Sequence, residues 1–167
     1  MAATKTILAA LMAAGLLAAC SSDSENAATT GAGGASSASG MGGGSGSFRP
    51  GSQEDLAANI GDRVLFDTDR SSVRADQRTI LERQAGWLRQ YPQVQVSVEG
   101  HADERGTREY NLALGQRRAN AARDILVASG ASGARIQTIS YGKDRPEALG
   151  SDETAWAANR RAVTIVR

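Results

Sequence analysis

The sequence has a single cysteine, three prolines and an aromatic content of only 4%. One cysteine excludes an intramolecular disulfide, and His101, the only histidine, makes a poor zinc site when only carboxylates surround it. Nucleic-acid surfaces need basic patches beside stacking rings, whereas this chain has few rings and a formal net charge of +1. The sequence therefore predicts no metal, no cofactor and no nucleic-acid partner.

The first 47 residues are poor in charge and rich in Ala, Gly and Ser. Lys5 precedes an apolar run from Ile7 to Ala19, which is too short to span a bilayer comfortably. A positive residue followed by a short apolar run is typical of a secretory signal. We therefore expect residues 1–19 to be a signal peptide.

Cys20 directly follows Leu17-Ala18-Ala19. This arrangement resembles a bacterial lipobox, in which the cysteine is diacylated and becomes the mature N-terminus. Each buried acyl methylene adds about 0.8 kcal/mol, so several chains anchor a protein firmly. Ser21 follows the cysteine instead of Asp, which favours the outer membrane by the sorting rule of such lipoproteins. The alternative is an ordinary secretory signal with an incidental cysteine.

Between the cysteine and residue 47 the chain offers almost nothing larger than Ala and Thr, so this stretch cannot bury a core. Gly/Ser chains behave as random coils, and a stretch of this length has a root-mean-square reach of about 30 Å. We expect residues 20–47 to be an acylated tether. Dense charge and apolar periodicity then indicate a domain over residues 48–167.

Apolar periodicity alternates between strands and helices within that domain. Thr107 is a plausible helix N-cap and Gly130 a plausible helix end. Gly86 and Gly115 fall inside helices, which predicts close backbone packing at both. The expected fold is α+β, a two-layer βαβαββ sandwich with helices on one face of a mixed four-stranded sheet. The expected strands are 63–66, 94–99, 136–141 and 162–166, and the expected helices are 75–90, 107–128 and 152–159.

The segment from Glu99 to Arg118 concentrates the charged residues that suit a binding site. Asp103, Glu104 and Arg105 follow a strand and precede a helix, where free N–H groups favour anions. These three residues are therefore candidates for a binding loop.

Arg118 falls on the apolar stripe of the helix expected at 107–128, where an unpaired charge is costly. It therefore needs a carboxylate partner, either from Asp103 or from a ligand. Arg117 fits an overlapping stripe, so spacing alone does not decide between the two arginines. An internal Arg–Asp pair that only holds the helix to the loop stays open.

The run VSVEGHADERGTREYNLALGQRRANAARDIL is similar to the signature of OmpA-like peptidoglycan-binding domains. The resemblance continues through SYGKDRP and NRRAV and covers nearly all of residues 60–167. It implies that the domain binds diaminopimelate in the stem peptide of the cell wall. It also implies that Asp103 is the binding aspartate, that Arg118 binds the ligand carboxylate, and that Asp69 and Arg105 line the pocket.

The same resemblance implies the partners of the protein. Anchored lipoproteins with this domain bind peptidoglycan and the periplasmic β-propeller protein TolB, so we expect both, together with the outer membrane through the lipid anchor. Asn159, Arg160 and Arg161 match the family either as ligand contacts or as structural residues. Tyr110 and Trp87 are expected to pack in the interior.

Two other functions compete with wall binding. A wall hydrolase would use an acid/base pair from Glu99, Asp103 and Glu104, but the chain has few aromatic platforms and no activated nucleophile, so no catalysis is expected. A protein-docking module with a vestigial wall site is the other alternative.

The lipobox predicts the result of changing Cys20. Cys20→Ser removes the thiol that would be acylated, and the protein is expected to move from the membrane fraction to the soluble fraction of lysed cells. The measurement is immunoblotting after membrane separation. Retention of the variant in the membrane fraction would place the anchor elsewhere.

Overall fold

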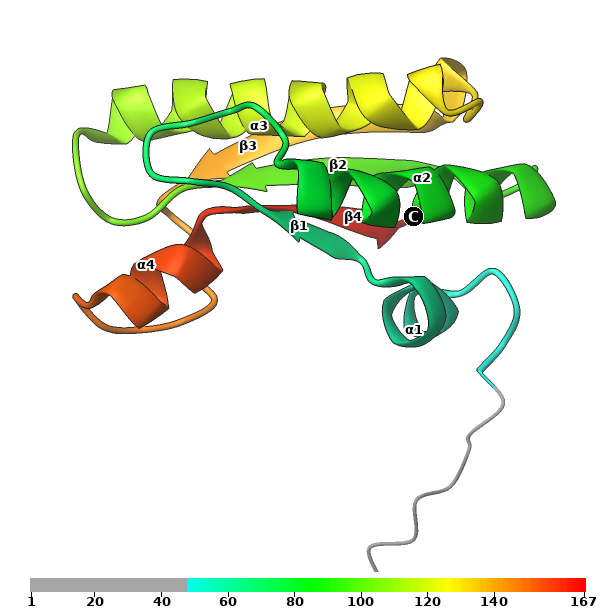
Figure 1. Cartoon of the computed structure of the whole chain (residues 1–167), viewed down its shortest axis with the longest axis horizontal. Helices are drawn as coiled ribbons and strands as arrows, with labels where there is room; N and C mark the ends of the chain where they lie inside the picture. Colours follow the sequence, from blue (N-terminus) through cyan, green and yellow to red (C-terminus); the bar gives the residue numbers. More distant parts are fainter. Residues whose placement is uncertain (1–47) are drawn as a thin grey trace, which may run out of the picture. The chain divides into compact units, whose positions relative to one another are not determined.

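The computed structural model describes residues 48–167, so the expected signal peptide (1–19), Cys20 and the expected tether (20–47) lie outside the described residues. Figure 1 shows the arrangement of the described elements. In chain order they are α1 (Gln53–Asp55) with a π-helical continuation (Leu56–Ile60), β1 (Arg63–Leu65), α2 (Ala75–Gln90), β2 (Val96–His101), α3 (Arg108–Ala128), a 3₁₀ turn (Gly133–Arg135), β3 (Ile136–Gly142), α4 (Glu153–Asn159) and β4 (Arg161–Val166).

The four strands form one mixed sheet in the order β1-β4-β2-β3. β2 and β3 are parallel, which is possible because α3 crosses over the sheet between them. β4 pairs antiparallel with both β1 and β2. The long helices α2 and α3 cover one face of this sheet (Figure 1). The predicted two-layer βαβαββ fold is therefore confirmed.

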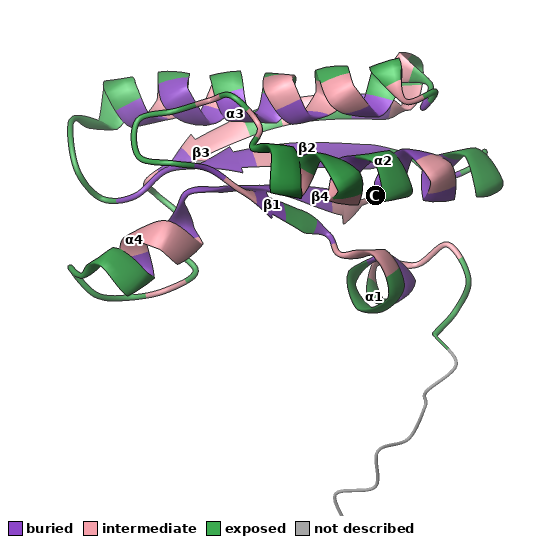
Figure 2. Cartoon of the chain, viewed as in Figure 1, coloured by how far each residue is buried: buried purple, intermediate pink, exposed green. Residues whose placement is uncertain are grey.

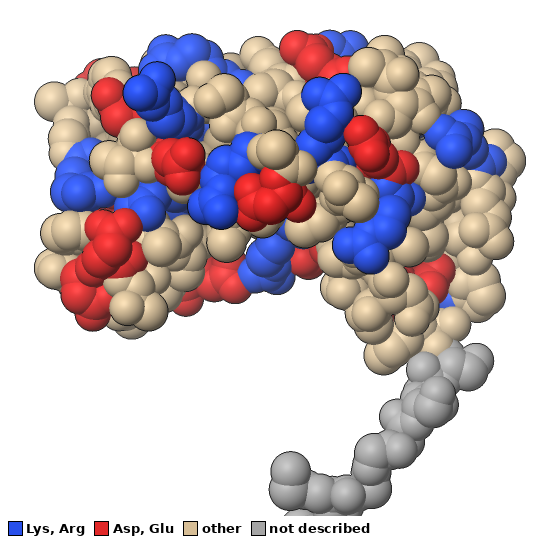
Figure 3. Space-filling view, viewed as in Figure 1, with Lys and Arg blue, Asp and Glu red and all other residues tan. Residues whose placement is uncertain are grey.

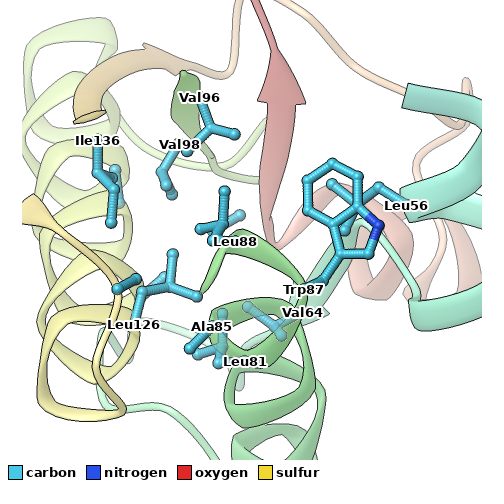
Figure 4. Packing of buried hydrophobic residues seen from close by; sticks show 14 of the residues in the cluster. Leu56, Val64, Leu81, Ala85, Trp87, Leu88, Val96, Val98, Leu126 and Ile136 are labelled. Carbon is cyan, nitrogen blue, oxygen red and sulfur yellow. The ribbon is translucent and has the colours of Figure 1, made fainter. Parts of the chain in front are cut away.

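The core lies between the sheet and the two long helices. Val96 and Val98 of β2 point into it, as the alternation in this strand predicts, and meet Leu88 and Leu126 from the helices (Figure 4). Buried residues accordingly form stripes on the sheet-facing sides of α2 and α3 (Figure 2). This one core joins the helices to the strands whose ends carry the candidate site.

The ends of α3 follow from local sequence. The Thr107 side chain accepts a hydrogen bond from the Tyr110 N–H at 3.2 Å, which is an N-cap, as predicted. Gly130 follows the last turn with a φ of 95°, a conformation that few residues other than glycine adopt readily. The helix therefore begins directly after the loop that carries Asp103 and Arg105.

The helix α1 and its continuation were not predicted from the sequence. Leu56 of this segment is fully buried in the core, and the Asp55 carboxylate accepts a hydrogen bond from the Trp87 indole at 2.9 Å. The Gln53 side chain accepts from the backbone N–H of Val166 at 2.7 Å. The segment thus fastens to the far end of β4. Its sequence signals were short: Ser52 as N-cap and an apolar pair four residues apart.

Gly86 and Gly115, the two glycines inside helices, differ in how closely other atoms approach them. A Cβ on Gly115 would collide with Ser140 Oγ and lie 2.8 Å from the Gly100 carbonyl oxygen, so α3 and β2 approach at backbone distance. A Cβ on Gly86 would meet only Arg89 Nη2, at 3.7 Å. Close packing is therefore correct for Gly115 and wrong for Gly86. No helix in residues 48–167 combines the length and apolarity that crossing a membrane requires.

This difference predicts opposite effects of one substitution. Gly115→Ala should lower the free energy of unfolding by about 2 kcal/mol or more, because α3 and β2 must move apart. Gly86→Ala is the matched control and should be neutral or stabilising by up to about 1 kcal/mol, since alanine favours the helix. Urea denaturation of both variants provides the measurement. Equal effects would contradict the close approach of α3 to β2.

Candidate functional site

A cavity of about 230 Å³ opens where β2 ends and α3 begins. Its walls come from the loop after β1, the loop between β2 and α3, and the first turns of α3. Three of the four residues implied as ligand contacts, Asp69, Asp103 and Arg105, line it together, whereas Arg118 does not. The other lining residues are Thr68, Gly106, Tyr110, Asn111 and Leu114.

Asp103 is 7% exposed, and nitrogen donors surround its carboxylate. Oδ1 accepts from the backbone N–H and the Nε of Arg105, both at 3.1 Å. Oδ2 accepts from Arg105 Nη2 at 2.7 Å and from Arg160 Nη1 at 3.5 Å. Burial raises the pKa of Asp103, but the hydrogen bonds and charge of Arg105, aided by Arg160, outweigh burial and bring this pKa below its usual value. Asp103 is therefore a carboxylate at neutral pH.

Asp69 supplies a second carboxylate from the loop between β1 and α2. Its φ of 55° is left-handed, which Asp tolerates better than most residues, and this turn directs the chain back toward α2. The Tyr110 hydroxyl donates a hydrogen bond to Asp69 Oδ1. Tyr110 is 45% exposed and lines the cavity, so its expected packing role is wrong. Tyr110 lies four residues before Leu114, which also lines the cavity, and this helical spacing was the sequence signal that places the two side chains on the same face of α3.

Arg105 forms the outer wall of the cavity. Its side chain is 40% exposed, and its guanidinium lies 4.2 Å from the centre of the Trp156 ring. Asn111, which sequence reasoning did not single out, is buried and donates from Nδ2 to the Arg105 carbonyl at 2.8 Å. The loop between β2 and α3 is therefore held from inside by α3 and from outside by α4.

Arg118 is 0% exposed and satisfies its charge with backbone oxygens. Nε donates to Arg70 O at 2.8 Å, Nη1 to His101 O at 2.8 Å and Nη2 to Asp67 O at 3.0 Å. Among residues 48–167 no carboxylate pairs with Arg118, and three carbonyl dipoles accept its hydrogen bonds instead. An internal pair with Asp103 is also absent from the described residues, since the ion-pair partners of Asp103 are Arg105 and Arg160.

Burial lowers the pKa of Arg118 to about 10, with the charges of Asp103 and Asp69 opposing the shift. Arg118 is therefore still a cation at neutral pH, close to both carboxylates of the cavity. Arg117, the alternative arginine, is exposed and lies over the Tyr110 ring at 5.9 Å. Direct contact between Arg118 and a ligand stays a prediction.

The three residues of the Asn159-Arg160-Arg161 stretch have different structural roles. The Asn159 side chain accepts from the backbone N–H groups of Glu147 and Ala148, so it shapes the loop before α4. Arg161 Nε lies 2.8 Å from Glu147 Oε2, but its N–H is not directed at that oxygen, so the contact is an ion pair without a hydrogen bond. Only Arg160 reaches the cavity residues.

His101 is buried on the sheet face away from the helices, 3.8 Å from Glu99, and neither ring nitrogen has a hydrogen-bond partner. Burial, followed by the charge of Arg161, lowers the pKa of His101 to about 4, so the ring is neutral. Across residues 48–167, no three His, Cys, Asp or Glu side chains are grouped to hold a metal ion. Lys/Arg and Asp/Glu side chains intermingle over the face shown in Figure 3, without a continuous basic stripe.

Comparison with known proteins places these features in a family. Residues 65–161 match the model of the OmpA family. The peptidoglycan-associated lipoprotein of Rhizobium meliloti (strain 1021) is 58% identical over 127 residues, covering 76% of this chain and 72% of the relative. That of Mesorhizobium japonicum is 62% identical over 123 residues, covering 74% of this chain and 73% of the relative.

Solved structures agree with the fold. The crystal structure of the peptidoglycan-associated lipoprotein from Burkholderia pseudomallei aligns with a TM-score of 0.65 and 41% identity, over 71% of this chain and 100% of that one. The C-terminal domain of Helicobacter pylori MotB aligns with a TM-score of 0.60 at 21% identity, over 64% of this chain and 84% of that one. The second likeness concerns the fold alone.

The burial of Arg118 predicts a strong effect on stability. Arg118→Met should lower the free energy of unfolding by about 3 kcal/mol, because three carbonyl groups lose their donors and the bond to His101 O is buried. Arg117→Met, one residue away and exposed, should change it by less than about 0.5 kcal/mol. Denaturant unfolding of both variants tests this. Comparable losses in the two variants would show that the three carbonyl bonds contribute little.

Proposed function

Because this chain belongs to the OmpA family, we propose that its cavity binds peptidoglycan non-covalently, through the diaminopimelate side chain of the stem peptide. Relatives that are 58% and 62% identical to it carry the name peptidoglycan-associated lipoprotein. The described residues offer two carboxylates and an arginine in one cavity, an arrangement suited to binding without a chemical step.

The observation that carries the proposal is the charge pattern of this cavity. The free end of diaminopimelate presents one ammonium and one carboxylate. Asp69 and Asp103 offer acceptors for the ammonium from two different loops, and both belong to the lining. Arg105 and the amino end of α3 offer donors for the carboxylate. A ligand with both charges fits this pattern better than a ligand with one.

Arg118 contributes to the same pattern from behind the cavity. Its buried positive charge lies near both carboxylates and adds attraction for the carboxylate of the ligand. Direct contact with its guanidinium would require Asp67 O or Arg70 O to give up its bond. Both oxygens belong to the loop between β1 and α2, so a small shift of that loop would admit the ligand.

The proposal includes a setting in the cell, which the relatives and the N-terminal sequence support. The protein is an outer-membrane lipoprotein acylated at Cys20, with residues 1–19 removed and residues 20–47 acting as a tether for the domain at 48–167. It links the outer membrane to the cell wall as part of a Tol-Pal type system that supports envelope integrity and cell division. A TolB-like β-propeller protein is its periplasmic partner. The names of the relatives support the lipoprotein and the wall-binding parts of this proposal.

Two muropeptides that differ in one carboxylate test the proposal. We expect the chain without residues 1–19, carrying Cys20→Ser, to bind a muropeptide with meso-diaminopimelate at least about tenfold more tightly than one with lysine, which lacks the terminal carboxylate. Asp103→Asn and Asp69→Asn should each weaken the diaminopimelate complex by about tenfold or more, because the ammonium loses a charged acceptor. Isothermal titration calorimetry gives the affinities.

Asp124→Asn is the matched control, because Asp124 is exposed on α3 outside the cavity lining. Its affinity should equal that of the parent. Sedimentation with purified sacculi should follow the same order of variants. Equal affinity for the two muropeptides would contradict recognition of the carboxylate, and a parent protein that stays in the supernatant would contradict wall binding itself.

A further inference from the structure

The two arginines that contact Asp103 differ in freedom. Arg105 lies on the outer wall with 40% of its side chain exposed, whereas the Arg160 side chain is 7% exposed and reaches the carboxylate from behind. Arg105 makes the shorter contacts with Asp103, and Arg160 the longer one at 3.5 Å. Proximity alone would therefore give Arg105 the larger role in holding the carboxylate.

Four hydrogen bonds hold Arg160 in place, in addition to its contact with Asp103. Its Nε donates to Phe66 O at 3.2 Å, and its Nη2 donates to Glu153 Oε1 at 2.6 Å. Its backbone carbonyl accepts from the Phe66 N–H at 2.9 Å, and its backbone N–H donates to Trp156 O at 3.0 Å. Arg160 thus links α4 to the strand end that leads to Asp69 and to the carboxylate of Asp103.

Binding of a ligand ammonium to Asp103 would displace one of the two arginines that contact it. The Asp103 oxygen atoms that would accept the ammonium are those that Arg105 now occupies. Arg105 can release them at low cost, since its guanidinium already lies on the Trp156 ring and is half open to solvent. Release by Arg160 would leave the buried Phe66 carbonyl without its side-chain donor.

We propose that Arg160 is a positioning residue that keeps the Asp103 carboxylate ionised and directed into the cavity, while Arg105 is the exchangeable counter-ion that the ligand ammonium displaces. This inference rests on the function proposed above and adds a division of roles between two arginines. It gives the second residue of the Asn159-Arg160-Arg161 stretch an indirect role in binding.

Electrostatics gives the proposal a measurable consequence. Once the ligand ammonium has replaced Arg105, Arg160 and the buried Arg118 are the arginines among residues 48–167 that still lie near Asp103. Without Arg160, the pKa of Asp103 in the complex rises, because a hydrogen-bond donor and positive charge that oppose the effect of burial are lost. Binding needs the carboxylate, so it fails as the pH falls through this pKa.

The charged or titratable groups around Asp103 are Arg105 and Glu104 from its own loop, Asp69 from the loop after β1, Tyr110 and Arg118 from α3, and Arg160 and Glu153 from the α4 region.

The test compares two neighbouring buried arginines. Arg160→Met should weaken binding of the meso-diaminopimelate muropeptide about tenfold at pH 7 and move the acid midpoint of binding to higher pH by about half a unit or more. Arg161→Met is the matched control, because Arg161 is equally buried but pairs with Glu147 on the other face of the sheet. Both variants should lose stability, and only Arg160→Met should change the pH midpoint. Arg160→Lys, which keeps the positive charge, should return the acid midpoint of binding most of the way to the parent value.

Each outcome decides the proposal. A folded Arg160→Met protein with parent affinity and an unchanged midpoint would overturn it, as would equal midpoint shifts in both methionine variants. Should Arg160→Met not fold, Glu153→Gln loosens Arg160 from an exposed position, and parent-like binding by that variant would overturn the proposal instead. A parent protein that binds neither muropeptide would overturn the proposed function together with this inference.

Discussion

The buried guanidinium of Arg118 is the interaction on which the rest of the site depends. Its three bonds to carbonyl oxygens tie α3 to the end of β2 at His101 and to the loop after β1 at Asp67 and Arg70. Asp103 lies two residues after His101, and Asp69 lies between Asp67 and Arg70. One side chain therefore sets the distance between the two carboxylates of the cavity, and a planar cation with several donors suits this task better than an ammonium group.

From the interior outward, charge alternates in sign around the cavity. Arg118 and Arg160 lie buried, Asp103 comes next, and Arg105 closes the outer side. Such layering compensates the desolvation of each buried charge, since every charged group has opposite charges or carbonyl dipoles as neighbours. The contacts that stabilise the loop between β2 and α3 therefore also set the charge pattern of the cavity.

Much of the fold follows from short-range pattern. The helical spacing of Leu81, Ala85 and Leu88, followed by Pro92, accounts for α2, and Thr107 predicted the start of α3. The segment Gln53–Ile60 was missed because its apolar signal is a single pair of residues and its burial depends on contacts with Trp87 and β4, far along the chain. Gly86 and Gly115 look alike in sequence, and only the position of α3 against Gly100 distinguishes them.

By itself, the sequence determined the order of strands and helices, the loop that carries Asp103 and Arg105, and the family that its motifs resemble, because periodicity, caps and motif spacing are local properties. Only the tertiary structure decided that Arg118 is buried and Arg117 exposed, that Tyr110 reaches Asp69, and that Arg160 contacts Asp103. The physical reason is that these contacts join segments far apart in the chain. Their geometry depends on how closely α3 packs on the sheet, and no pattern along the sequence encodes that distance.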